Sequence, residues 1–178
     1  MAQLVMNWKN DGTESVAPVI PEGVEVKTFP ELPNAVYEWL DIVRFMDQEE
    51  EPISDIKKYE EDMYSYPTYN DNMCYFLLIN GVPLATITVI CDYEKKEGYI
   101  HMVSSKPEFR GKGLGHLMNS IAVHTLKKEG METAYLTTDD WRIAAIKTYL
   151  RAGFEPDLDS EPDYKERWAK IYAIIENK

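Results

Sequence analysis

The amino-acid sequence predicts a mixed α/β fold in one globular domain, and two local patterns carry this prediction. An apolar run at residues 99–103, a glycine-dense segment at 110–115 and an amphipathic helix pattern follow one another along the chain. Two further strand-like runs are joined by Asn80-Gly81, a dipeptide that readily adopts the positive φ angles of a tight hairpin turn. With 178 residues, 44% of them hydrophobic, the chain is long enough to bury a substantial core.

The first half of the chain is predicted to hold a strand, two helices and a hairpin. Residues 24–29 alternate between apolar and charged side chains, as a half-buried strand does. Pro33 and Asn34 suit the start of a helix whose apolar residues recur at helical spacing as far as Met46. The other elements predicted in this half are a short helix at 53–66 and the hairpin strands at 73–79 and 82–91.

The second half alternates strands and helices. After a strand at 98–104, a helix has Leu117 and Ile121 on its apolar face and Asn119 among its polar residues, and Gly130 ends it. Asp139 and Asp140 are predicted to cap the next helix. The remaining predicted elements are a strand at 133–138, a helix from 143 to about 150, and a strand at 168–175 that pairs back into the sheet. Residues 1–22 lack periodicity and are predicted to form an arm that wraps the domain at 23–178 or stays mobile.

The glycine-dense segment predicts an anion site. Glycine lets the backbone approach a ligand closely, and the first N–H groups and positive dipole end of the following helix favour a phosphate. A P-loop is excluded because Gly113, and no hydroxyl residue, follows Lys112. A dinucleotide fingerprint fits poorly because His116 stands at its last glycine position. A plain glycine turn before a surface helix is the remaining alternative to a diphosphate cradle.

Two motifs carry a family resemblance. Arg110, Gly113 and Gly115 match the pattern Arg/Gln-x-x-Gly-x-Gly/Ala, which resembles the acyl-CoA loop of the GNAT superfamily of N-acetyltransferases. Residues 145–154 supply a second block, Ala-x-x-x-Tyr-x-x-x-Gly-Phe, and the resemblance extends over residues 73–176.

This resemblance implies a particular fold and cofactor. The implied α/β (α+β) fold is a mixed, mostly antiparallel sheet that is splayed at its fourth strand and flanked by helices. Acetyl-CoA would lie in the splay, where peptide-like amides of its pantetheine arm can satisfy unpaired backbone groups as an added strand would. The cofactor-binding residues that the resemblance implies are Met102, Val103, Ser104, Arg110, Gly111, Lys112, Gly113, Leu114 and Gly115.

Acyl transfer from a thioester to an amine needs a group that removes a proton and a group that supplies one. Tyr149 matches the tyrosine of the second family block and is the candidate acid, although a tyrosine between apolar neighbours also suits a core. The residues do not single out a base. His101, beside the predicted thioester site, is the candidate, and a structural histidine is the alternative. Ordered water or one of Glu94, Glu97 and Asp139 could also take the proton.

Arg142 departs from the family pattern. It stands seven residues before Tyr149, where many relatives have asparagine. An arginine there could bind a cofactor phosphate, an acceptor carboxylate or the neighbouring Asp139. The sequence assigns it no role.

The charge and hydrophobicity of the chain indicate which partners and which cellular compartment to expect. A formal net charge of −12 argues against nucleic acid and suits either a cationic amine acceptor or solubility alone. No apolar run approaches the ~20 residues that span a bilayer and no leader pattern opens the chain, so we expect no membrane and a cytoplasmic location. Cys74 and Cys91 lie in apolar runs and read as buried hydrophobes, with no sign of a metal or a disulfide.

The sequence therefore predicts a GNAT-type acyltransferase that moves acetyl from acetyl-CoA to a primary amine of a small molecule or protein, by direct attack in a ternary complex and without a metal. A noncatalytic acyl-CoA-binding regulatory module is the alternative, and a hydroxyl acceptor or a longer acyl donor is a further variant. The identity of the acceptor and the oligomeric state, with a homodimer among the candidates, are left open.

Overall fold

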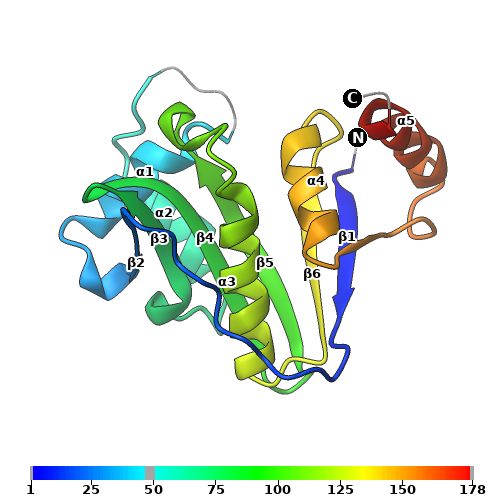
Figure 1. Cartoon of the computed structure of the whole chain (residues 1–178), viewed down its shortest axis with the longest axis horizontal. Coiled ribbons are helices and arrows are strands. Elements are labelled where there is room, and N and C mark those ends of the chain that lie inside the picture. Colours follow the sequence, from blue (N-terminus) through cyan, green and yellow to red (C-terminus); the bar gives the residue numbers. More distant parts are fainter. Residues whose placement is uncertain (1, 47–50, 177–178) are drawn as a thin grey trace.

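The computed structural model describes residues 2–46 and 51–176. Within this part of the chain, seven strands form one sheet with the order β2-β3-β4-β5-β6-β1-β7 (Figure 1). Neighbouring strands are antiparallel except β5 and β6, which are parallel. The strands are β1 Leu4–Lys9, β2 Val24–Thr28, β3 Cys74–Ile79, β4 Val82–Asp92, β5 Glu97–Ser105, β6 Thr133–Thr138 and β7 Glu155–Pro156. The helices are α1 Ala35–Val43, α2 Lys57–Tyr64, α3 Gly115–Lys128, α4 Ile143–Arg151 and α5 Tyr164–Glu176. The mixed, mostly antiparallel sheet with flanking helices is confirmed.

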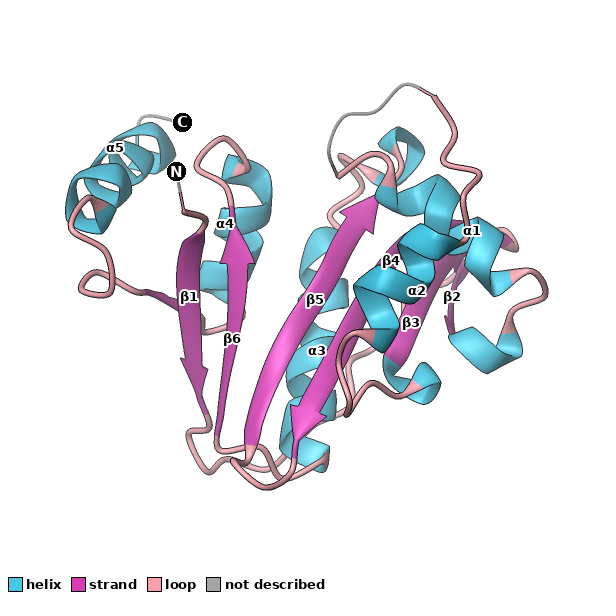
Figure 2. Ribbon diagram, turned by 180° about the vertical axis from the view of Figure 1, so that it is seen from behind, coloured by secondary structure: helices cyan, strands magenta, loops and turns pink. Residues whose placement is uncertain are grey.

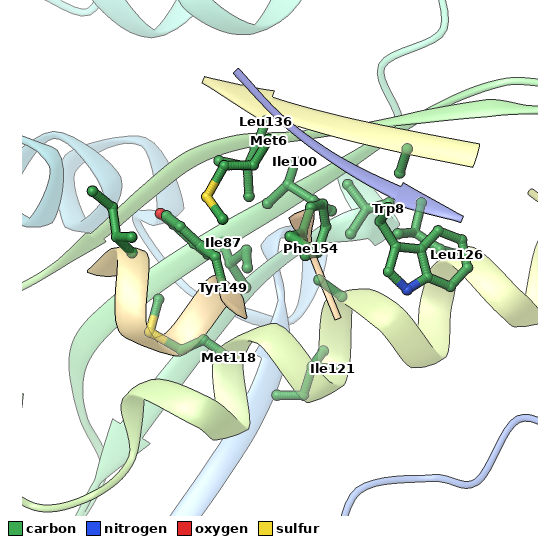
Figure 3. Close-up of a cluster of buried hydrophobic side chains, with 14 of the residues drawn as sticks. Met6, Trp8, Ile87, Ile100, Met118, Ile121, Leu126, Leu136, Tyr149 and Phe154 are labelled. Carbon is green, nitrogen blue, oxygen red and sulfur yellow. The ribbon is translucent and has the colours of Figure 1, made fainter. Parts of the chain in front are cut away.

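Helices cover both faces of the sheet. α3 and α4 lie on one face, and α1 and α2 lie on the other face over the half that holds β3 and β4 (Figures 1 and 2). The larger core lies beneath α3 and α4, where Met118, Ile121 and Phe154 pack with Met6 and Ile100 (Figure 3). A second core joins α1 and α2 to β3.

Local chemistry explains the elements predicted correctly. The turn between β3 and β4 has positive φ at both Asn80 (51°) and Gly81 (78°), as a tight hairpin turn requires. α3 buries Leu117, Ile121 and Leu126 at helical spacing. The ends of α1 and α2 differ from prediction by a few residues, since α1 stops at Val43 and α2 starts at Lys57.

The beginning of the chain differs from the predicted arm. β1 lies inside the sheet, antiparallel to both β6 and β7. Leu4, Met6 and Trp8 are buried, whereas Asn7 and Lys9 are exposed. This period-two alternation is the mark of a half-buried strand, and the scattered glycine and proline that follow it obscured the pattern. The later part of the predicted arm does run along α3, because Ser15 Oγ lies 2.8 Å from His124 Nδ1 and Asp11 binds Lys127 at 2.7 Å.

The end of the chain also differs from prediction, because residues 168–175 belong to helix α5 and not to a strand. Tyr164, Trp168 and Ile171 are buried on one face of this helix, at helical spacing. Asp140, expected to cap α4, instead binds the buried Arg167 of α5, with Nε 3.0 Å from Oδ2, and the N-cap of α4 is Arg142.

The predicted splay lies at β5, which is the fourth strand of the prediction and the fifth in the chain once β1 is counted. β5 pairs with β6 only from Glu97 to Ile100, and the two strands then diverge (Figure 2). β5 continues to pair with β4 through a bulge, in which Met102 and Val103 oppose Ile87 and Met102 has a φ of 50°. The last five residues of β5 therefore extend beyond their pairing with β6.

Replacing Met6 with alanine should test whether β1 is part of the core. Met6 is fully buried, so we expect Met6→Ala to lower the free energy of unfolding by about 2–5 kcal/mol. Asn7→Ala changes the adjacent exposed residue and should stay within about 0.5 kcal/mol of the parent. Urea unfolding measures both variants, and equal losses would contradict the placement of β1.

Candidate functional site

A cavity of about 640 Å³ lies among the end of β5, the start of α3 and the start of α4. These elements meet where β5 has separated from β6. The residues that line it are Phe45, Met46, Val103, Ser104, Ser105, Phe109, Arg110, Gly111, Gly113, Leu114, Gly115, Met118, Asn119, Trp141, Arg142, Ile143, Ala144, Ala145, Thr148 and Tyr149. The cavity thus joins the two sequence motifs, which are about thirty residues apart in the chain.

The glycine segment forms one wall of this cavity. Gly111 and Gly113 have φ angles of 72° and 70°, in the left-handed region that other residues rarely adopt. Apart from the glycine and its two chain neighbours, no heavy atom would lie within 4 Å of a Cβ at either position, so the backbone of the loop is open to a ligand. α3 begins at Gly115, and the first N–H groups of a helix have no partner within it. The loop and the helix start therefore present backbone donors and a positive dipole end to an anion.

The two cations of the loop differ in position. Arg110 folds back on the protein, and its Nη2 donates to the carbonyl of Ser105 at 2.9 Å and to that of Phe45 at 3.4 Å. This side chain ties the loop to β5. Lys112 is exposed and does not line the cavity among the described residues.

The predicted pantetheine-binding strand residues point in different directions. Val103 and Ser104 line the cavity, and Ser104 Oγ donates to the carbonyl of Ile42 at 2.8 Å, which ties β5 to α1. Met102 packs against the second core, which contains α1 and α2. Met102 and Val103 therefore lie on opposite faces of the sheet, as consecutive residues of a strand do, since Val103 packs against the larger core.

Arg142 crosses the splay. Its Nη2 donates to the carbonyl of Val103 at 2.9 Å, and its guanidinium lies 5.9 Å from the ring centre of Trp141. The contact joins the start of α4 to the free part of β5 and brings a positive charge to the cavity wall. The sequence left open a surface ion pair between Arg142 and Asp139. The hydrogen bond to Val103 does not favour that role.

Tyr149 lines the cavity from α4 and is 2% exposed. Its ring packs against Phe154 at a centroid distance of 6.4 Å, within the larger core (Figure 3). Burial raises the pKa of the Tyr149 hydroxyl, and the positive charge of Arg142 opposes that rise. The hydroxyl is therefore protonated at neutral pH.

His101 faces α2 and is 9% exposed. Its Nε2 lies 2.9 Å from the carbonyl of Asp62, an acceptor, so the neutral ring carries its proton on Nε2 and keeps a lone pair on Nδ1. Burial lowers the pKa of His101 below its ordinary value of 6.5, against the effects of that hydrogen bond and of the Asp62 charge. His101 is not among the residues that line the cavity, so the two predicted catalytic groups approach the splay from different faces of the sheet.

The three carboxylates that were also predicted as candidate bases lie in different parts of the fold. Glu97 begins β5, and Glu94 is exposed in the turn before it. Asp139 follows β6, and both of its carboxylate oxygens lie 3.3 Å from Nε2 of Gln3. The structure does not bring these carboxylates together with Tyr149.

A family comparison agrees with this geometry. The model described as the acetyltransferase (GNAT) family matches residues 34–154, well over half of the chain. This chain belongs to the GNAT family. The matched region contains β5, the glycine loop, α3 and α4, which together build the cavity.

Individual GNAT relatives support the same assignment. A mycothiol acetyltransferase from Streptomyces griseus is 30% identical over 139 residues, which are 77% of this chain and 45% of the relative. A GCN5-related N-acetyltransferase from Sphaerobacter thermophilus has the same fold, with a TM-score of 0.66 at 21% identity over 88% of this chain and 50% of that one. A structure of the NatC complex bound to Gag peptide and CoA matches with a TM-score of 0.57 at 19% identity over 72% of this chain and 82% of that chain. The chain spans about half the length of the mycothiol acetyltransferase that it matches.

Sequence reasoning missed one buried polar residue of this GNAT cavity. Asn119, predicted on the polar face of its helix, is 2% exposed, and its Nδ2 donates to Thr148 Oγ1 at 2.9 Å. Thr148 in turn donates to the carbonyl of Ala145 at 2.7 Å. This chain of hydrogen bonds fixes α3 to α4. The available signal was spacing, because Asn119 shares a helical stripe with Gly115 and the buried Leu126.

The described residues offer neither a reactive thiol nor a cluster of metal ligands. Cys74 and Cys91 are buried as expected, and burial raises the pKa of each thiol to about 11, so neither is a thiolate nucleophile at neutral pH. Across residues 2–46 and 51–176, no group of three or more His, Cys, Asp or Glu side chains is arranged to hold a metal ion. No described helix combines the length and apolarity needed to span a membrane.

Proposed function

We propose that this chain transfers an acetyl group from acetyl-CoA to a primary amine of a small molecule or protein, by direct attack of the amine in a ternary complex. One observation carries the proposal: the cavity in which the free end of β5, the glycine loop and the start of α3 meet. Membership of the GNAT family and the acetyltransferase names of its relatives support the reaction class.

The cavity residues fit coenzyme A. Gly111, Gly113 and the start of α3 present backbone donors that suit a diphosphate. Val103 and Ser104 belong to the part of β5 that extends beyond β6, where backbone groups can bond the amides of a pantetheine arm. Arg142 adds a positive charge beside them. Bound acetyl-CoA supplies an acetyl thioester that is activated toward amines.

His101 suits the role of base. Its ring is neutral at pH 7, and Nδ1 retains a lone pair because Nε2 faces the Asp62 carbonyl. Nδ1 can take the proton that the attacking ammonium must lose, directly or through a water molecule. The fixed tautomer orients this lone pair in advance.

Tyr149 suits the role of acid. Its hydroxyl holds a proton at neutral pH because burial raises the pKa, and it lies in the cavity wall. Tyr149 Oη can give this proton to the leaving thiolate. The nearby guanidinium of Arg142 stabilises the tyrosinate that remains.

Gly113→Glu tests the proposed diphosphate site. A side chain at a φ of 70° is strained, and a carboxylate repels an anion, so we expect acetyl-CoA affinity to fall about tenfold or more. Gly12→Glu is the matched control, because Gly12 also has a positive φ of 73° and open space around it but does not line the cavity. Calorimetric titration measures the acetyl-CoA affinity of both variants. Equal affinities would contradict the proposed diphosphate site.

Tyr149→Phe separates chemistry from binding. The variant keeps the buried ring and removes only the hydroxyl, so the rate of CoA release in the presence of amine should fall about 100-fold. The dissociation constant for acetyl-CoA and the melting temperature should stay close to those of the parent. An unchanged rate would make Tyr149 a packing residue, and binding without turnover in the parent itself would favour the regulatory module.

His101→Gln tests the base through pH. Glutamine can retain a hydrogen bond to the Asp62 carbonyl but cannot accept the proton. Because the pKa of His101 lies below 6.5, we expect the parent to exceed the variant by about 100-fold at pH 7 and this ratio to shrink as the pH falls below 6.5. The titration of the amine is common to both proteins and cancels in the ratio. A ratio that does not change with pH would assign His101 a structural role.

A further inference from the structure

A second cavity, of about 690 Å³, lies beside α2 and shares no lining residue with the first among the described residues. The connection between α2 and β3 lines most of it, and Tyr93 comes from the turn after β4. Four tyrosines and one carboxylate give it a chemical character that the acetyl-CoA cavity does not have. They are Tyr64, Tyr66, Tyr69, Tyr93 and Asp71.

The tyrosines are held in place by other protein groups. The hydroxyl of Tyr69 lies 2.7 Å from that of Tyr59, and the hydroxyl of Tyr93 donates to Glu129 at 2.7 Å. Tyr64 packs edge-on against Tyr59 at 5.6 Å, yet it remains 58% exposed, and Tyr93 remains 54% exposed. The rings are therefore ordered in advance while their surfaces stay accessible.

Carboxylates lie close to these tyrosines. Burial raises the pKa of Tyr64, and the carboxylates of Asp71 and Glu60 add to the rise. Burial raises the pKa of Tyr66 to about 12, with Asp62 contributing. A hydrogen bond to Glu129 is the main cause that raises the pKa of Tyr93 to about 12.

Lys58 pairs with Asp62 at 3.1 Å and offsets the charge of that carboxylate. Asp71 supplies the carboxylate of the cavity wall among the described residues. Ring faces and a carboxylate that converge in this way attract a positive charge, because a cation is stabilised over an aromatic face.

A continuous band of rings joins this cavity to the proposed base. Tyr66 lines the cavity, and its ring centre lies 4.8 Å from that of His101. Tyr99 lies 5.0 Å from His101 and stacks on Tyr135 at 4.6 Å, one residue before the pairing of β5 and β6 ends. The band therefore leads from the cavity to the place where the strands part.

We propose that the second cavity binds an ammonium group of the acceptor at a distance from the reacting amine, so that the acceptor is an organic diamine or polyamine. The proposal rests on the proposed function, because it extends the acceptor from His101 along the ring band. The Asp71 carboxylate and the exposed tyrosine faces bind the distal ammonium, while the other amine reacts.

The test compares α,ω-diamines of four to ten carbons with monoamines of the same length, using acetyl-CoA and thiol release. A diamine has two equivalent reactive ends, so its kcat/KM is divided by two before the comparison. We expect this corrected kcat/KM of the best diamine to exceed that of the monoamine of the same length by about tenfold or more. In Asp71→Asn and in Tyr64→Leu, which keeps apolar volume without a ring, this preference should largely disappear while the monoamine rate is unchanged. Asp159→Asn removes an exposed carboxylate paired with Lys165 and should keep the preference.

Calorimetric titration of the same diamine without acetyl-CoA separates the two proposals. Saturable binding that Asp71→Asn weakens, in a protein that acetylates no amine, would support the ammonium site and contradict the transferase. Turnover with equal rates for diamines and monoamines, insensitive to Asp71→Asn, would overturn the site and leave the transferase standing. An absence of saturable diamine binding would overturn the site in either case.

Discussion

The early end of pairing between β5 and β6 determines where the first cavity lies. These parallel strands share only the register from Glu97 to Ile100. Beyond it, the bulge at Met102 bends β5 toward α1 while β6 continues toward α4. A strand that loses one neighbour keeps backbone donors and acceptors that need other partners. The cavity, the contact with Arg142 and the approach of Tyr149 all follow from this separation.

The two faces of the sheet have opposite electrostatic characters. On the face with α3 and α4, the helix start and Arg142 present positive charge to the first cavity, although the whole chain carries −12. On the face with α2, tyrosine rings and the carboxylate of Asp71 line the second cavity. An anionic donor and a cationic acceptor would thus approach the splay from different sides. In the proposed reaction, this separation of charge would keep each ligand away from the other's site.

The sequence predicted the elements that local chemistry determines. The hairpin at Asn80-Gly81, the glycine loop, and helix α3 each have their signal within a few residues. The predictions for β1 and α5 were wrong because distant segments set the surroundings of both elements. β1 lies between strands that begin at Thr133 and Glu155, and the buried face of α5 packs in the core that contains Leu4 and Met6. The contact of Arg142 with the Val103 carbonyl joins residues 39 positions apart. No local pattern specifies such a pairing.

Hydrogen–deuterium exchange with and without acetyl-CoA can show whether the cofactor binds at the splay, because it reports on the backbone groups themselves. Acetyl-CoA should slow exchange in residues 103–105 of β5 and in the glycine loop and leave β2 and β3 unchanged. Saturable binding of acetyl-CoA that leaves exchange in both segments unaltered would contradict the assignment of the splay as the cofactor site.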